Sequence, residues 1–161
     1  FTGSLPAIAF AFDRQKMKES EVTSKDFFNP RVVFLTIFIG IVVSLMLFGL
    51  YLALLSLGLA VELARAIIFA SFGSYTLFIA FSFRDLSRPV YQYSLTENHT
   101  LLAGVGIGAL ILIATFTVPL LRETFAVEPL PLIWVGFVLA WSLVNIVVVE
   151  AAKWFANRFL V

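Results

Sequence analysis

Long uncharged, apolar windows separated by short charged segments make up most of the sequence. Windows without Asp, Glu, Lys or Arg cover residues 32–61, 66–83, 100–121 and 132–149. A helix needs about 20 apolar residues to cross the roughly 30 Å hydrocarbon core of a bilayer. Each window has about that length or more, so the pattern predicts four transmembrane helices.

These windows are predicted to be helices, because the windows lack the short alternation of apolar and polar residues that barrel strands have. An open sheet edge would also leave backbone N–H and C=O groups without hydrogen bonds in lipid. The first window would form a helix of about 45 Å, longer than the lipid core, so we expect it to tilt, bend or project. The connector Glu62–Arg65 is short enough to make the first two helices adjacent and antiparallel. We therefore predict an all-α membrane protein, a four-helix transmembrane bundle with up-down topology.

The N-terminal segment has a different character from the four-span domain of residues 31–161. Residues 1–12 are apolar but too short to span a bilayer, and Pro6 marks a break. We interpret residues 1–30 as the end of a truncated preceding helix followed by a cytoplasmic loop. The chain is therefore expected to be part of something larger.

Orientation is predicted from the cationic residues, because cytoplasmic segments near helix ends collect Lys and Arg. Nine of the 11 Lys and Arg residues lie in the N-terminal segment, the central loop and the C-terminal tail, whereas only Arg65 and Arg122 lie in the other two connectors. We expect both termini to be cytoplasmic. The chain is therefore predicted to be a multi-pass protein of the cell membrane.

Composition supports a membrane location and excludes several functions. The chain is 61% hydrophobic and 13% charged, and these charges are too few to keep a soluble globule of this size in water. A net charge of +1 argues against a nucleic-acid partner. Without cysteine and with one histidine, the sequence offers no zinc or iron–sulfur ligand cluster, so no metal site is assigned.

Candidate chemistry is sparse, because every carboxylate lies in a connector or at the edge of a span. An ionisable side chain at mid-membrane would mark a functional site, and its absence argues against a self-contained cation pathway. Polar side chains in the second and fourth spans could still line such a path, although close helix packing is the favoured interpretation. The candidates in these spans are Ser71, Ser74, Tyr75, Thr76 and Asn145.

Two glycines in the third span indicate close helix contact. Gly104 and Gly108 form a GxxxG pair, which allows two membrane helices to approach closely. Gly106 lies between them, but the resulting GxGxG pattern lies inside a span rather than after a strand, so it is not a nucleotide-binding loop.

Several short motifs follow the order found in one family. Residues 2–7 (TGSLPA) resemble the Thr-Asp-Gly-Leu-Pro-Ala stretch at the end of the sixth membrane helix of P-type cation-transporting ATPases. Residues 81–84 (FSFR), followed by Asn98, are similar to the end of the eighth helix and the start of the ninth. Residues 150–153 (EAAK) resemble the family's final helix.

This resemblance implies that the chain is the C-terminal membrane region of an ATP-driven cation pump, with helices seven to ten after the end of helix six. Such pumps use ATP and Mg²⁺ in separate cytoplasmic domains. The Asp-Lys-Thr-Gly-Thr phosphorylation motif is absent from this chain, so no catalytic residue and no cofactor is assigned to it. In the family, the last helices brace the ion-translocating helices.

The resemblance also implies a reduced set of ion ligands. In the first motif Gly3 replaces the acidic residue, which leaves Thr2 as the only matching ligand there. Near the eighth-helix ligand position the sequence offers Tyr75 or Thr76 and no carboxylate, so the transported ion stays unassigned. The implied partners are the lipid bilayer, the remaining pump domains and the transported cation.

Two alternatives stay open. The chain could be a free-standing membrane scaffold that merely resembles the end of a pump, or an oligomeric channel built on the hydroxyl face of the second span. A homo-oligomer is a further open alternative, because helix faces that are normally covered by missing helices could meet another copy of the chain.

Overall fold

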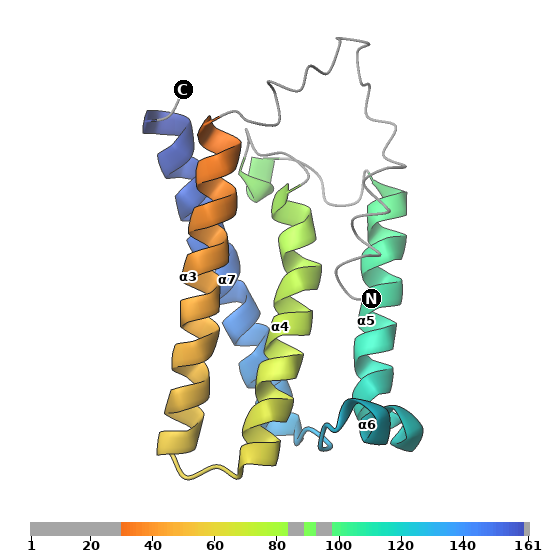
Figure 1. The fold of residues 1–161 in the computed structure, drawn as a ribbon. Coiled ribbons are helices and arrows are strands. Elements are labelled where there is room, and N and C mark those ends of the chain that lie inside the picture. The colour runs from red at the N-terminus through yellow and green to blue at the C-terminus, as the bar shows by residue number, and fades with distance from the viewer. Residues whose placement is uncertain (1–29, 84–88, 93–97, 160–161) are drawn as a thin grey trace.

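The structure is a computed structural model that describes residues 30–83, 89–92 and 98–159. Within these ranges every regular element is helical, which confirms the predicted all-α class. The predicted helix remnant and loop of residues 1–30 lie outside the described residues except for Pro30, and Thr2 lies outside them as well. The elements in chain order are α3 (Pro30–Ser56), α4 (Val61–Phe83), the 3₁₀ helix η1 (Val90–Gln92), α5 (His99–Thr117), α6 (Pro119–Phe125) and α7 (Leu132–Phe159) (Figure 1).

Four helices are long and apolar enough to cross a membrane, which confirms the predicted number of spans within the described part of the chain. Successive long helices run in opposite directions (Figure 1). The first residue of α3 and the last residue of α7 therefore lie at the same end of the bundle, which we call the η1 end. The opposite end carries the α3–α4 turn and α6, and we call it the α6 end.

The first span is shorter than the apolar window of residues 32–61, because α3 ends at Ser56. Gly58 adopts a φ of +79°, a conformation that glycine tolerates without a steric penalty. Its N–H donates to the Leu55 carbonyl at 3.0 Å, and the Leu59 N–H donates to the Leu54 carbonyl at 3.3 Å. This pattern is a Schellman motif that stops the helix. The connecting turn is therefore residues 57–60, and the expected connector Glu62–Arg65 lies inside α4.

The third apolar window, residues 100–121, contains two helices rather than one. Val118 is extended, with φ −87° and ψ 119°, because the residue before a proline is sterically biased away from the helical region. Pro119 then occupies the first turn of α6, where its missing N–H costs nothing. The last span is longer than its window of residues 132–149, since α7 continues to Phe159. Glu150 ends the uncharged stretch but not the helical hydrogen bonding.

Helix α4 is the centre of the bundle. It contacts α3, α5 and α7, whereas α5 contacts α4 and α6 (Figure 1). Of the 18 residues in the most apolar window of α4, 61% are buried. In the corresponding windows of the other three spans, 17–22% of the residues are buried. Most residues of the other three helices are therefore at least partly exposed, as expected for faces that meet lipid or further membrane helices.

Candidate functional site: a polar layer between α4 and α7

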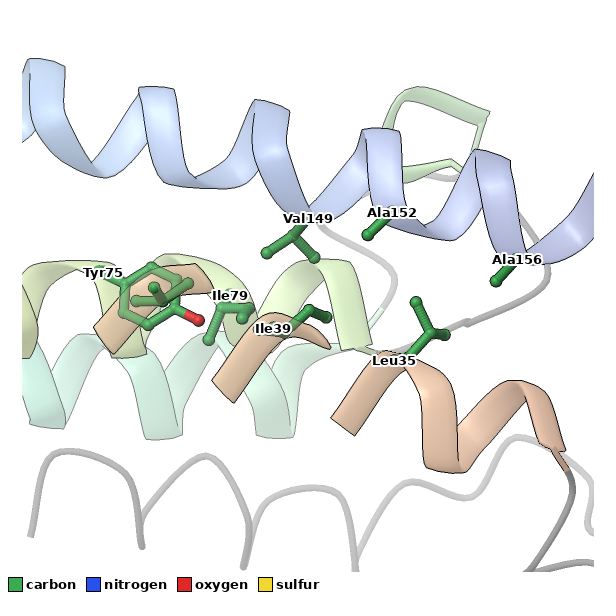
Figure 2. Close-up of a cluster of buried hydrophobic side chains, with 8 residues drawn as sticks. Leu35, Ile39, Tyr75, Ile79, Val149, Ala152 and Ala156 are labelled. Carbon is green, nitrogen blue, oxygen red and sulfur yellow. The ribbon is translucent and has the colours of Figure 1, made fainter. Parts of the chain in front are cut away.

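The packing of α4 against α7 alternates between apolar and polar contacts. Towards the η1 end, Tyr75 and Ile79 of α4 belong to one apolar cluster with Val149 and Ala152 of α7. Figure 2 shows these α4 and α7 side chains together with Leu35 and Ile39 of α3. We call this group the η1-end cluster.

A second apolar cluster lies towards the α6 end. There Ile67 and Ala70 of α4 pack with Val138 of α7 and with Leu50 and Leu54 of α3. We call it the α6-end cluster. The two clusters leave a short stretch of the α4–α7 interface between them, because no buried member of either cluster lies among residues 71–74 or 139–148.

Polar side chains occupy this stretch. Ser71, Ser142 and Asn145 are completely buried, and Ser74 is 6% exposed. Both helices thus present hydroxyl or amide groups between the two apolar clusters, close to the middle of each span. We call Ser71, Ser74, Ser142 and Asn145 the polar layer.

Hydrogen bonds satisfy only part of the polar layer. Ser142 Oγ donates to the Val138 carbonyl at 2.9 Å, and Asn145 Nδ2 donates to the Trp141 carbonyl at 2.8 Å. Within the described residues, Ser71 Oγ and Asn145 Oδ1 are buried without a hydrogen-bond partner. An unsatisfied buried polar atom costs about 1–3 kcal/mol, so these two oxygens are available to an additional ligand or partner.

The remaining candidates of the second span do not join the polar layer. Tyr75 packs in the η1-end cluster (Figure 2). Thr76 is half-buried, and its hydroxyl donates to the Phe72 carbonyl at 2.7 Å, one turn earlier in the same helix. Such a bond within the helix leaves the Thr76 hydroxyl without a free proton to donate. The structure thus buries Ser71, Ser74, Tyr75 and Asn145 and leaves Thr76 half-buried.

Three glycines are buried on α4 and α5. Gly104 and Gly108 are both buried on α5. A residue that sequence reasoning missed is Gly73 of α4, where an added Cβ would lie 2.7 Å from Leu112 Cδ1 of α5. Gly73 has no glycine partner at the spacing of a GxxxG pair, so its role depends on the facing helix and not on a local pattern.

A second polar group, also missed from the sequence, lies at the η1 end. Lys153 is 1% exposed, and its Nζ lies 3.0 Å from Glu150 Oε1 and donates to the Ser82 carbonyl at 2.9 Å. The backbone N–H of Val90 in η1 donates to Glu150 Oε2 at 3.2 Å. We call these contacts the Lys153 tie. The spacing of Glu150 and Lys153 on one helix face was the only signal in the sequence.

The chemistry available in the membrane interior is neutral. The polar layer offers hydroxyl and amide oxygens, and no group of three His, Asp or Glu side chains that could hold a metal ion occurs in the described part of the chain. Such oxygens can form hydrogen bonds between helices or contribute to a cation site that other helices complete.

Three apolar helices packed around a fourth, buried and partly polar helix define the chain as a multi-pass integral membrane domain. A family model described as "Cation transporting ATPase, C-terminus" matches residues 1–155, and the chain therefore belongs to this family. It is the C-terminal membrane part of a P-type cation-transporting ATPase, as the motif order predicted. No curated protein and no solved structure matches the chain.

Proposed function

We propose that this chain is the membrane support domain of an ATP-driven cation pump and that it braces the ion-translocating helices without catalysing a reaction itself. The family match to residues 1–155 supports the assignment to a pump. The observation that carries the bracing role is the enclosure of α4 by α3, α5 and α7. A helix that is packed on three sides is held in a fixed position, so it can support neighbouring helices that move during transport.

Three contacts support a fixed position for α4. The Lys153 tie holds its end to α7, the two apolar clusters hold its length against α3 and α7, and Gly73 brings it close to α5. The outer faces of α3 and α7 carry exposed large apolar side chains, such as Ile41 and Leu143. These faces suit contacts with lipid or with the remaining membrane helices of the pump.

The absence of catalysis is tested by ATP hydrolysis. Purified chain in phospholipid vesicles is expected to release no phosphate from ATP and Mg²⁺, because the reaction belongs to the cytoplasmic domains of the pump. A complete pump of the family, reconstituted in the same vesicles, is the positive control. Turnover that persists after purification to homogeneity would eliminate the proposal.

The bracing role needs a test in a complete pump that carries this segment. Replacing Gly73 by leucine should loosen α4 from α5 and lower the maximal rate of ion-dependent ATP hydrolysis. The matched control is Gly106→Leu, since Gly106 faces open space on α5. Equal activities of the two variants would argue against a bracing role.

A second candidate function is a contribution of the polar layer to the ion path. Ser71 Oγ and Asn145 Oδ1 favour it, because they are buried and have no partner within the described residues. Thr2, Tyr75 and Thr76 are further candidates from the family resemblance. In a complete pump, Asn145→Leu would then weaken the apparent ion affinity, whereas Ser142→Ala, which removes a hydroxyl bonded within its own helix, would not.

The alternative of an oligomeric channel predicts a different result. The chain alone, reconstituted in liposomes, would conduct cations, and changing Ser74 and Tyr75 to alanine would alter the flux. A tight liposome, or a flux that both substitutions leave unchanged, would argue against the channel.

A further inference from the structure

A groove opens between α4, α5 and α7 towards the α6 end. Its volume is about 510 Å³, and its walls include Phe78 of α4, Ala109 and Leu112 of α5, and Leu139 of α7. The only side-chain hydroxyls on its walls are those of Ser74 and Thr117, and Thr117 Oγ1 already donates to the Ile113 carbonyl at 3.0 Å. The groove is therefore an apolar slot in the membrane-spanning part of the bundle.

The length of the groove fits one leaflet of a bilayer. Along α5 it extends from Val105 to Thr117, a rise of about 18 Å at about 1.5 Å per residue. One leaflet contributes roughly half of the roughly 30 Å hydrocarbon core. At the other end the slot is closed, because Ala80 of α4 packs directly on Leu101 of α5. A transmembrane helix needs the full thickness of the core, so it is longer than this slot, whereas an acyl chain of one leaflet is not.

One cationic residue, Arg122, lies on α6, in the segment of chain between the groove-lining residues Thr117 and Pro129. Arg122 lies one helical turn beyond Val118. Its carbonyl accepts the N–H of Val127, and Val127 precedes the groove-lining Pro129 by two residues. Its Nε is buried and has no hydrogen-bond partner in the described ranges. A guanidinium at a membrane interface is a strong binder of phosphate oxygens.

We propose that this groove binds the acyl chain of a phospholipid from the leaflet at the α6 end, with the lipid phosphate held by Arg122. The apolar walls accommodate the hydrocarbon, and the closed end at Ala80 and Leu101 limits it to one leaflet. The site does not depend on the pumping function. It would let lipid fill the space between α4, α5 and α7 that the groove-lining residues enclose.

Lipid-dependent stability tests the proposal on the chain itself. Delipidated chain in detergent is titrated with dioleoylphosphatidylcholine or with dioleoylglycerol, which has the same acyl chains but no phosphate, and Tm is recorded. We expect Tm to rise at lower concentrations of the phospholipid. Ala109→Phe, which fills the groove, should raise the concentration for half-maximal stabilisation by about tenfold, equivalent to about 1.4 kcal/mol. Ala103→Phe on the exposed face of the same helix is the matched control.

The headgroup contact is tested separately. Arg122→Gln should remove most of the preference for the phospholipid over dioleoylglycerol, and Arg158→Gln, at the opposite end of the bundle, should not. If Ala109→Phe fails to fold, Leu139→Trp is used instead to block the groove from α7. Leu139 is 47% exposed, so this substitution leaves the core intact. Equal lipid responses of the groove-filling variant and the Ala103→Phe control would overturn the proposal. Binding of both lipids with equal strength to the unchanged chain would overturn the role of Arg122.

Discussion

Lys153 Nζ donates a hydrogen bond of 2.9 Å to the main-chain carbonyl of Ser82, 71 residues earlier in the chain. The bond joins the last turns of α7 to the end of α4, where helix carbonyls lack partners within the helix. The same ammonium group pairs with Glu150, whose second oxygen accepts the Val90 N–H. One buried cation therefore connects two spanning helices with the short helix η1.

Removing this cation should destabilise the protein strongly. In Lys153→Met, the Glu150 carboxylate keeps only the Val90 N–H and the Ser82 carbonyl loses its donor. Breaking a buried ion pair in this way costs about 3–5 kcal/mol, so Tm in detergent should fall by several degrees. The double variant Glu150→Gln/Lys153→Met should lose less, since no unpaired charge remains. If the loss of stability in the double variant equals the sum of the losses in Glu150→Gln and Lys153→Met, this account is wrong.

The glycines of α5 predict a contrast within one motif. Gly104→Leu or Gly108→Leu places a large side chain on the buried face of the helix and should cost about 1–3 kcal/mol through overpacking. Gly106→Leu should cost nothing, because an added Cβ there meets no atom within 4 Å. Thermal unfolding of the three variants in the same detergent measures the difference. If all three melt at the temperature of the unchanged chain, the glycines do not lie at a tight contact.

Asn145 predicts an unusual response to substitution. Its Oδ1 is buried without a partner, and its amide group only donates back to the Trp141 carbonyl of its own helix. Asn145→Leu keeps the branching of the side chain and removes the unsatisfied acceptor, so stability should stay the same or rise by about 1 kcal/mol. The reference variant is Ser142→Ala. A marked loss of stability in Asn145→Leu would show that the amide has a partner in the folded protein.

The proposed orientation can be tested with single cysteines, because the sequence contains none. A cysteine at Leu57, which is 72% exposed in the α3–α4 turn, should react with a membrane-impermeant maleimide added outside intact cells. A cysteine at Phe159 should react only after permeabilisation, because α7 ends at the opposite end of the bundle. Labelling of both positions from the same side would refute the four-span arrangement. The reverse pattern would refute cytoplasmic termini.

Local patterns predicted the helices better than their ends. The window of residues 32–61 contains all of α3 except its first two residues, but Gly58 ends the helix at Ser56. The window of residues 100–121 is split because Val118 precedes a proline. Both features are visible in the sequence, but an uncharged window ignores them because glycine and proline carry no charge.

The candidate site was predicted only in part. Ser71, Ser74 and Asn145 were recognised as polar residues within spans, and all three are buried, the two serines on α4 and Asn145 on α7. Thr76 is also polar, but its hydroxyl donates a hydrogen bond to a carbonyl of its own helix. Periodicity alone could not separate these cases, because a serine that faces a neighbour and a threonine bonded to its own helix have the same sequence signature.

By itself the sequence determined that the chain crosses a membrane with four helices and belongs to the C-terminal region of cation-transporting ATPases. Apolar run length and motif order are properties of neighbouring residues, so they can be read without a fold. Only the tertiary structure decided that α4 is the centre, that Gly73 meets Leu112, and that Lys153 is buried against Ser82. These relationships join residues far apart in the chain, and packing selects them from many pairings that the same apolar surfaces would allow.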